Sequence, residues 1–191
     1  MIKIIKEYLN DSIETKQAIL KNENILKKVE EISKLIVNAL NNGNKILFIG
    51  NGGSASDCDH LATEFVSRFY KDRHAFNAMS LTSNNALITA LSNDFGFENV
   101  FARQIEALGK KGDILFALST SGNSKNIIKA IKIANEMEIF TFGMSGKNKC
   151  EMDEVCKSLV KIPNSETPVI QECQMTLAHI ICKIVEDKLL I

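Results

Sequence analysis

Five short apolar segments, separated by helical or polar stretches, constrain the fold of this chain more than any other feature. They lie at residues 45–49, 76–81, 113–118, 139–145 and 158–162. Most are apolar throughout, which is the pattern of strands buried on both faces of a parallel sheet. Helical spacing fills the gaps between them at residues 54–69, 85–91 with 97–108, and 124–137. The pattern predicts an α/β fold, a three-layer α-β-α sandwich with a doubly wound, five-stranded parallel sheet and right-handed crossovers.

The first forty residues contain no glycine or proline and carry apolar side chains at helical spacing. They predict a helical pair over residues 1–42, which Gly43 ends. Residues 43–191 then form an α/β core with a long C-terminal helix, so residues 1–191 make a single domain. Two helices before the first strand carry more apolar surface than is needed to cover the sheet. Their surplus apolar face predicts packing between subunits, with packing inside one chain as the alternative.

Composition limits the classes of partner. Lys plus Arg and Asp plus Glu number 23 each, so charge gives no reason to expect a nucleic acid or an anionic membrane surface. No apolar run approaches the ~20 residues that cross a bilayer, and the opening residues lack the apolar core of a signal peptide. The five cysteines include no CxxC pair, as expected of reduced thiols. These features predict a cytoplasmic protein.

Three loops follow predicted strands at the edge of the sheet where ligands bind. They are GNGGSAS at residues 50–56, SNDFGF at 92–97 and STSGNS at 119–124. The first satisfies the dinucleotide pattern G-x-G-x-x-A through Gly50, Gly52 and Ala55. That pattern also requires an acidic residue about 20 positions later, at the end of the next strand. The second strand here ends in SLTSNN without an acid, so we expect no nucleotide cofactor.

The third loop favours a phosphate. It offers four hydroxyl groups around a glycine at the start of a helix, those of Ser119, Thr120, Ser121 and Ser124. The helix dipole and free backbone N–H groups attract anions at such a point. An ordinary helix cap is the alternative, but a cap needs only one hydroxyl.

The helix after the first loop carries titratable groups along one stripe. Asp57, His60, Glu64 and Arg68 are spaced at i, i+3, i+7 and i+11, so they share a face. Spacing alone is equally typical of a solvated face with ion pairs, whereas the position beside the glycine-rich loop favours catalysis. His179, on the last helix, has apolar neighbours, and from the sequence alone it is predicted to be a hydrogen-bonded core histidine.

Four motifs in order, GNGGSASD…H…E, NDFGFE, STSGNS and IQE…H, resemble the sugar isomerase (SIS) domain family over nearly the whole chain. More narrowly they are similar to the sedoheptulose-7-phosphate (phosphoheptose) isomerase family. The resemblance implies a flavodoxin-like sheet, a cytoplasmic homotetramer with active sites near subunit interfaces, and one Zn²⁺ per subunit. The implied reaction converts sedoheptulose 7-phosphate to D-glycero-D-manno-heptose 7-phosphate through an enediol(ate). The product would supply heptose for lipopolysaccharide or capsule.

The same resemblance implies roles for individual residues. Glu64 and His179 would be the acid/base pair, and the metal ligands would be His60, Glu64, Gln171 and His179. Eight residues of straight helix rise ~12 Å, so Gln171 and His179 either reach toward a midpoint or one of them comes from a neighbouring subunit. The implied substrate-binding residues are Asn51, Gly52, Gly53, Ser54, Glu64, Asn93, Asp94, Ser119, Thr120, Ser121, Ser124 and Gln171. For Asn93 and Asp94, capping of the following helix is the alternative.

Two other functions remain open. A non-catalytic SIS-domain regulator, or a scaffold of the replication-initiator-associating type, would have no need of the acid/base and metal candidates. An isomerase of a shorter sugar phosphate would use the same chemistry. Val169 stands where the family commonly has an arginine, which leaves the preferred sugar undecided.

Overall fold

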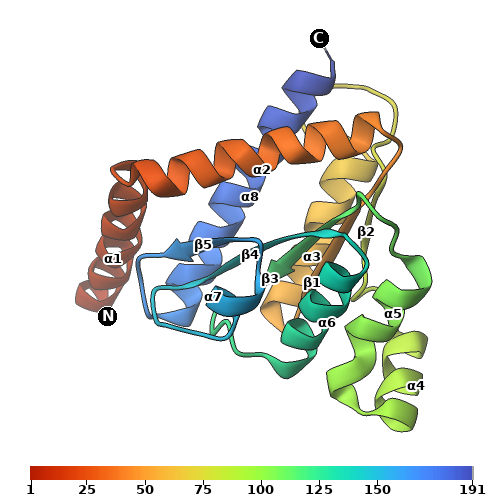
Figure 1. The fold of residues 1–191 in the computed structure, drawn as a ribbon. Coiled ribbons are helices and arrows are strands. Elements are labelled where there is room, and N and C mark those ends of the chain that lie inside the picture. Colours follow the sequence, from red (N-terminus) through yellow and green to blue (C-terminus); the bar gives the residue numbers. More distant parts are fainter. Residues whose placement is uncertain (191) are drawn as a thin grey trace.

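A computed structural model, which describes residues 1–190, has five parallel strands in one sheet between layers of helices (Figure 1). The strands are β1 (Ile46–Gly50), β2 (Ala78–Ser80), β3 (Ile114–Leu118), β4 (Phe140–Gly146) and β5 (Ser158–Ile162). Their spatial order is β2-β1-β3-β4-β5, which is the flavodoxin-like order, with the point of reversal between β1 and β3. The predicted three-layer, doubly wound fold is confirmed.

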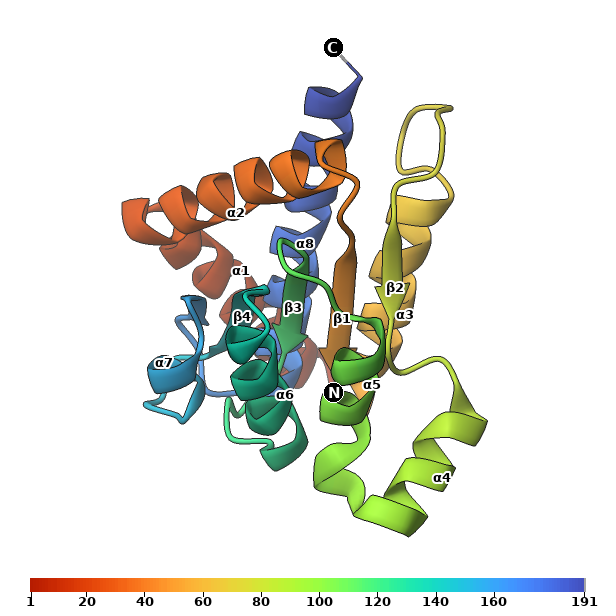
Figure 2. The same ribbon diagram turned by 45° about the vertical axis from the view of Figure 1, so that its right-hand side comes forward.

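Successive strand residues face opposite layers, and each layer has its own apolar core. Phe48, Phe116 and Phe142 face the layer of α2 (Glu23–Asn41), α3 (Gly53–Val66) and α8 (Thr167–Leu189). Leu47 and Leu115 face the other layer. That layer contains α4 (Asn85–Phe95), the short 3₁₀ turn η1 (Phe97–Asn99), α5 (Val100–Leu108), α6 (Lys125–Glu136) and α7 (Met152–Val155) (Figure 2). Each fully buried side chain stabilises the fold by about 1.5–3 kcal/mol, which accounts for strands that are apolar throughout.

The two strands that flank the reversal are aligned over their whole length. Ile46 lies beside Ile114 and Gly50 beside Leu118. The loops after β1 and β3 therefore leave the sheet at the same height, and this alignment brings the glycine-rich and serine-rich loops together.

The N-terminal pair consists of α1 (Ile2–Leu20) and α2, which are joined at Asn22. The Asn22 side chain caps α2 by accepting from the N–H groups of Asn24 and Ile25. Helix α2 covers the sheet within the chain. Helix α1 lies at the periphery (Figure 1) and is attached to the rest mainly through polar groups.

Four hydrogen bonds make the polar attachment of α1. They run from Tyr8 Oη and Ser12 Oγ to Glu172 (2.9 and 2.7 Å), and from Asn164 Nδ2 to Asp11 Oδ1 and Thr15 Oγ1 (2.9 and 2.8 Å). Large apolar side chains on the same helix are exposed, namely Ile2, Ile4, Ile5, Leu9 and Ile13. The surplus apolar surface predicted for the helical pair thus belongs to α1.

Several element boundaries differ from the sequence-based expectation. Helix α3 ends at Val66 and not at residue 69. Helix α4 continues to Phe95, so Asn93 and Asp94 lie in its last turn and not in a loop; the chain leaves the helix at Gly96, whose φ of +83° suits glycine. Helix α8 begins at Thr167, with Pro168 in its first turn, where a missing N–H is tolerated.

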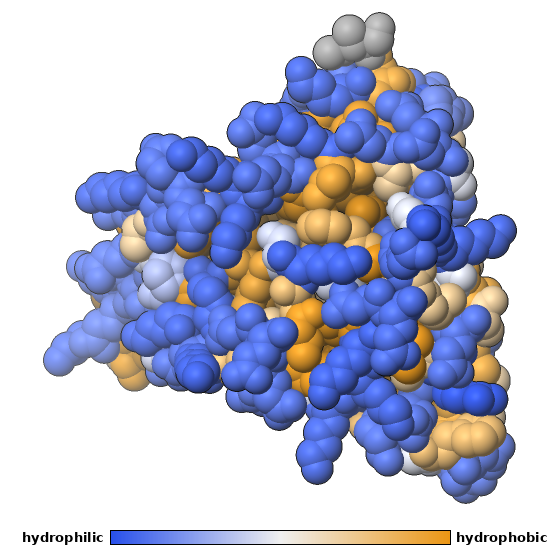
Figure 3. Space-filling model, in the orientation of Figure 1, coloured by the Kyte–Doolittle hydropathy of each residue, from blue (hydrophilic) through white to orange (hydrophobic). Residues whose placement is uncertain are grey.

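Polar side chains cover most of the surface seen in Figure 3, and apolar side chains emerge in a band below α2, over β4 and β5. Among the described residues, no helix is both long and apolar enough to cross a membrane. The five cysteines are free thiols, and burial raises the pKa of Cys182 to about 12.

Residues 67–77, which lead from α3 to β2, are fastened to α8 by a buried ion pair. Arg73 Nε donates to Glu186 Oε1 at 3.1 Å, and both side chains are 1% exposed. The Glu186 carboxylate also accepts from the backbone N–H groups of Phe69, Tyr70 and Lys71 (2.9–3.1 Å). The Arg73 guanidinium donates to the carbonyl oxygens of Glu64, Phe65, Ser67 and His74. The pair therefore satisfies carbonyls at the end of α3 that have no partner within the helix.

The Glu186→Gln variant should lose about 1–3 kcal/mol of unfolding free energy at pH 7, because buried N–H donors lose a charged acceptor. Burial alone raises the pKa of Glu186, but the backbone N–H groups and Arg73 together hold it below its ordinary value of 4.5. The carboxylate therefore contributes stability above about pH 4.5, and this stability is lost as the pH falls through the lower, folded-state pKa. Urea denaturation from pH 7 to roughly pH 3 should show the wild type and the variant converging. A difference that stays constant with pH would contradict this role.

Candidate functional site

The glycine-rich loop after β1 turns the chain sharply into α3. Gly52 has φ +57° and ψ −124°, a backbone conformation open to glycine. At Gly50, a Cβ atom would lie 2.5 Å from the carbonyl oxygen of Ser54, so the strand and the helix approach too closely for a side chain. The loop therefore places the N-terminus of α3 at the carboxyl edge of the sheet, with the N–H groups of Ser54 and Ala55 donating to the carbonyl oxygens of Asn51 and Gly52.

Three side chains from α3 and α8 meet in one cluster. His60 and Glu64 lie one turn apart on α3, with 3.3 Å between His60 Nε2 and Glu64 Oε1. His179 of α8 places its Nε2 atom 3.1 Å from His60 Nε2. One nitrogen or oxygen atom from each residue falls within 4.8 Å of the other two. His179 is partly exposed, so the expectation of a core histidine is wrong; its apolar neighbours line the other sides of α8.

The His60–Glu64–His179 cluster suits a divalent metal. Two donors bound tetrahedrally to zinc at about 2.0–2.1 Å are about 3.3 Å apart, close to both measured separations. Two imidazoles and a carboxylate are also a donor set typical of catalytic zinc, with a position left for substrate or water. These three residues could hold the ion.

Gln171, the fourth predicted ligand, has a different partner in the structure. Its Nε2 atom donates to Asp57 Oδ2 at 2.7 Å, and its amide lies over Gly53, where a Cβ atom would come within 2.8 Å of it. Partial burial raises the pKa of Asp57, although the hydrogen bond from Gln171 and the nearby His60 oppose this shift. Asp57 was visible on the predicted stripe, yet nothing in the sequence pointed to its bond with Gln171.

The serine-rich loop leads into α6 as predicted. Ser119 Oγ accepts from Gly122 N at 3.1 Å and lies 3.3 Å from Ser124 Oγ, while Ser121 Oγ accepts from Asn123 N. Ser124 occupies the N-cap position but makes no side-chain cap bond. Thr120 and Ser121 line a polar cavity of about 260 Å³. The hydroxyls thus shape the loop around its backbone N–H groups and leave the helix N-terminus available to an anion.

Sequence reasoning placed two further substrate contacts at Asn93 and Asp94. Both are exposed in the last turn of α4, and Asn93 Nδ2 donates to Asp94 Oδ1 at 2.8 Å. The capping alternative fails, since Gly96 precedes η1 and Asn99 precedes α5.

Sequence reasoning also missed a pair of amides that joins two of the loops. Asn51, the first residue after β1, exchanges two hydrogen bonds of 2.9 Å with Asn126 of α6. Nothing in the spacing of these residues, 75 positions apart, could have indicated the pair.

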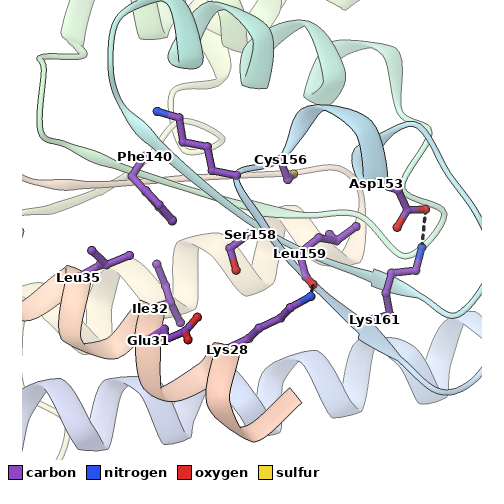
Figure 4. A pocket seen from close by; sticks show the side chains of 11 residues that line it. Lys28, Glu31, Ile32, Leu35, Phe140, Asp153, Cys156, Ser158, Leu159 and Lys161 are labelled. Atoms are coloured by element: carbon purple, nitrogen blue, oxygen red, sulfur yellow. Dashed lines mark hydrogen bonds and ion pairs between the residues drawn. The ribbon is translucent and has the colours of Figure 1, made fainter. Parts of the chain in front are cut away.

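A cavity of about 400 Å³ lies away from the cluster, among α2, β4, α7 and β5 (Figure 4). Its three ammonium groups already have partners. The bonds run from Lys28 Nζ to Leu159 O (2.8 Å), from Lys157 Nζ to Ile139 O (3.1 Å) and from Lys161 Nζ to Asp153 Oδ2 (3.0 Å). With its lysines engaged in the edge of the sheet and α7, this cavity is a poor match for a phosphate.

Sequence and structure comparisons with known proteins lead to the same family. Residues 7–146 match the SIS domain. Phosphoheptose isomerase 2 of Campylobacter jejuni is 48% identical, over 97% of this chain and 92% of that protein. Two solved phosphoheptose isomerases have similar structures. The one from Neisseria gonorrhoeae has a TM-score of 0.91 at 33% identity and the one from Francisella tularensis 0.93 at 29%, each over 97% of this chain and 98% of the other.

Two glycines of the first loop should respond differently to alanine. In Gly50→Ala the new Cβ meets the backbone of Ser54 at 2.5 Å, which we expect to cost about 1–3 kcal/mol of unfolding free energy. In Gly53→Ala it meets the end of the Gln171 side chain, which can move away, so stability should change by less than about 1 kcal/mol. Urea denaturation measures both, and equal losses would contradict the close approach described at Gly50.

Proposed function

Because the chain belongs to the SIS domain family, we propose that it isomerises sedoheptulose 7-phosphate to D-glycero-D-manno-heptose 7-phosphate. One observation carries the proposal most directly. The His60–Glu64–His179 cluster joins α8 to α3, the helix that begins at the glycine-rich loop, and this fold binds ligands at the edge of the sheet where that loop lies. The relatives named above are phosphoheptose isomerases, which supports this choice of substrate.

The reaction moves a carbonyl group from C2 to C1 through an enediol(ate). Glu64 takes the proton from C1 and returns it at C2. His179 gives a proton to the carbonyl oxygen and later takes one from the C1 hydroxyl, through the ring nitrogen that would not bind the metal. Glu64 directs one carboxylate oxygen toward His60, and its second oxygen serves for proton transfer. Glutamate and histidine are suited to general acid–base catalysis when held within hydrogen-bond reach of the reacting atoms.

We propose Zn²⁺ as the metal, with His60, Glu64 and His179 as ligands and Gln171 as the fourth. When bound, the ion would act as a Lewis acid on the carbonyl and hydroxyl oxygens. Gln171 can instead orient a substrate hydroxyl from its place on Asp57. His60 holds Glu64 and His179 together in either case, since its Nε2 atom is close to both.

The phosphate is proposed to bind at the N-terminus of α6, through the backbone of the serine-rich loop and the hydroxyls of Ser119, Thr120, Ser121 and Ser124. Helix N-termini bind anions through free N–H groups and the helix dipole. The sugar end then lies toward the backbone of residues 51–54. Asn93 and Asp94, which are exposed in the last turn of α4, are proposed as further contacts to the substrate. The enzyme is proposed to work in the cytoplasm, and its product to supply heptose for lipopolysaccharide or capsule.

The Glu64→Gln variant should lose about 10²–10⁴-fold in kcat, because an amide cannot accept the C1 proton. The assay follows aldose formation from sedoheptulose 7-phosphate, with and without a chelator; turnover lost on chelation and restored by Zn²⁺ supports the metal assignment. Glu31→Gln, on the exposed side of α2, is the matched control and should keep wild-type activity.

Full activity of the Glu64→Gln variant would show that the base is assigned wrongly. Turnover of a five- or six-carbon sugar phosphate in preference to the heptulose would identify a shorter substrate. A wild type that turns over no sugar phosphate but binds a protein partner would support the regulator or scaffold alternative.

We further propose that the chain forms a homotetramer through α1, with active sites near the interfaces. Ile5 and Leu9 are 56% and 55% exposed in a single chain, and contiguous apolar surface of this kind marks interfaces. The inward face of α1 buries the polar side chains of Ser12 and Thr15 and, near its C-terminal end, Ile19, whereas Ile5 and Leu9 stay exposed.

The double variant Ile5→Asp, Leu9→Asp should therefore have a smaller mass in solution than the wild type, measured by light scattering after size exclusion. Charges placed in an apolar interface must be desolvated without a partner. Lys3→Asp, which also adds negative charge to α1, is the control and should keep the wild-type mass. A monomeric wild type, or an unchanged mass of the double variant, would contradict assembly through α1.

A further inference from the structure

The Asn51–Asn126 pair links the two loops proposed to hold opposite ends of the substrate. Asn51 Nδ2 donates to Asn126 Oδ1 and Asn126 Nδ2 donates to Asn51 Oδ1, each at 2.9 Å. Asn126 is 2% exposed and lies in the first turn of α6, directly after the serine-rich loop. Asn51 opens the glycine-rich loop. The pair therefore crosses the point of reversal between β1 and β3.

A third hydrogen bond fixes the orientation of both amides. The backbone N–H of Ile127 donates to Asn126 Oδ1 at 2.9 Å, which identifies that atom as the oxygen, because an NH₂ group could not accept. Asn126 Nδ2 then faces Asn51, so the Asn51 atom that accepts its hydrogen bond must be the oxygen Oδ1. Turning either amide over would place NH₂ against NH₂ and oxygen against oxygen. The two side chains therefore hold a single arrangement.

This arrangement determines the spacing of the loops. The sheet aligns Gly50 with Leu118 and so brings the two loops together. Strand pairing ends at these residues, so the distance between the loops beyond them needs a further constraint. The amide pair supplies that constraint, and most of its hydrogen-bonding capacity is turned toward the protein. Asn51 could turn its amide toward a sugar only by breaking both bonds of the pair.

We infer that Asn126 is a positioning residue that sets the distance between the glycine-rich and serine-rich loops. Asn51 contributes its side chain to the site through this pair and not by contacting the substrate. The inference rests on the proposed function in one respect: the ligand must span both loops, with its phosphate on one and its sugar on the other. A ligand that needs only the serine-rich loop does not depend on the pair.

A double-mutant cycle tests this assignment with Asn51→Ala, Asn126→Ala and the combined variant. Affinities for sedoheptulose 7-phosphate and for inorganic phosphate are measured by calorimetry, and turnover is measured separately. Each single variant should bind the sugar phosphate about 5- to 100-fold more weakly, and the combined variant no more weakly than the worse single one, because both remove one interaction. Inorganic phosphate should bind within about twofold of wild type throughout, as coupling of independent sites is small.

One control separates positioning from general damage. Asn135→Ala removes another hydrogen-bonded asparagine of α6, which donates to Val155 O. It should lower thermal stability and leave both affinities unchanged.

Three results would overturn the inference. Losses that multiply in the combined variant would mean that Asn51 contacts the substrate independently. Equal losses of affinity for phosphate and for sugar phosphate would mean that Asn126 shapes only the serine-rich loop. A wild type that does not bind the sugar phosphate would mean that this ligand does not span the two loops. Binding without turnover would contradict the isomerase proposal, while the cycle still tests the pair.

Discussion

The contact between α3 and α8 assembles the cluster of side chains on which the proposed chemistry depends. One helix contributes His60 and Glu64 and the other His179 and Gln171, although more than a hundred residues separate them in the chain. The buried pair of Arg73 and Glu186 holds the far ends of both helices together. Arg73 donates to the carbonyl oxygen of Glu64 itself, and Phe69, whose N–H is bound by Glu186, stacks 5.6 Å from the His179 ring. The geometry of the cluster thus depends on one buried ion pair at its edge.

Much of the fold could be predicted because it follows from local pattern. Strands buried on both faces are apolar throughout, and a parallel sheet with intervening helices has few arrangements. His60 and Glu64 could be paired in advance, since residues four apart on a helix share a face. The glycine-rich and serine-rich loops could be placed at one edge of the sheet for the same topological reason.

Features that join distant segments could not be predicted. His179 has the surroundings of a core residue in sequence, and its exposure becomes visible only when α8 is seen against α3. Asn126 stands among apolar helix residues and gives no sign of its partner in the first loop. The end of α4 was misplaced because Asn93 and Asp94 are typical of loops, whereas the preceding apolar residues carry the helix through to Gly96. In each case tertiary contacts outweighed local preference.

The polar attachment of α1 has a consequence for how the chain becomes ordered. Fixing each residue of a helix costs about 1–2 kcal/mol of backbone entropy, and α1 has 19 residues. Hydrogen bonds that replace bonds to water return little of this. Of the large apolar side chains of α1, Ile19 packs into the core, whereas Ile2, Ile4, Ile5, Leu9 and Ile13 are exposed. The order of α1 therefore depends on what covers its outer face. If other copies of the chain cover this face, the fraction of molecules with an ordered α1 rises with protein concentration, because association follows mass action.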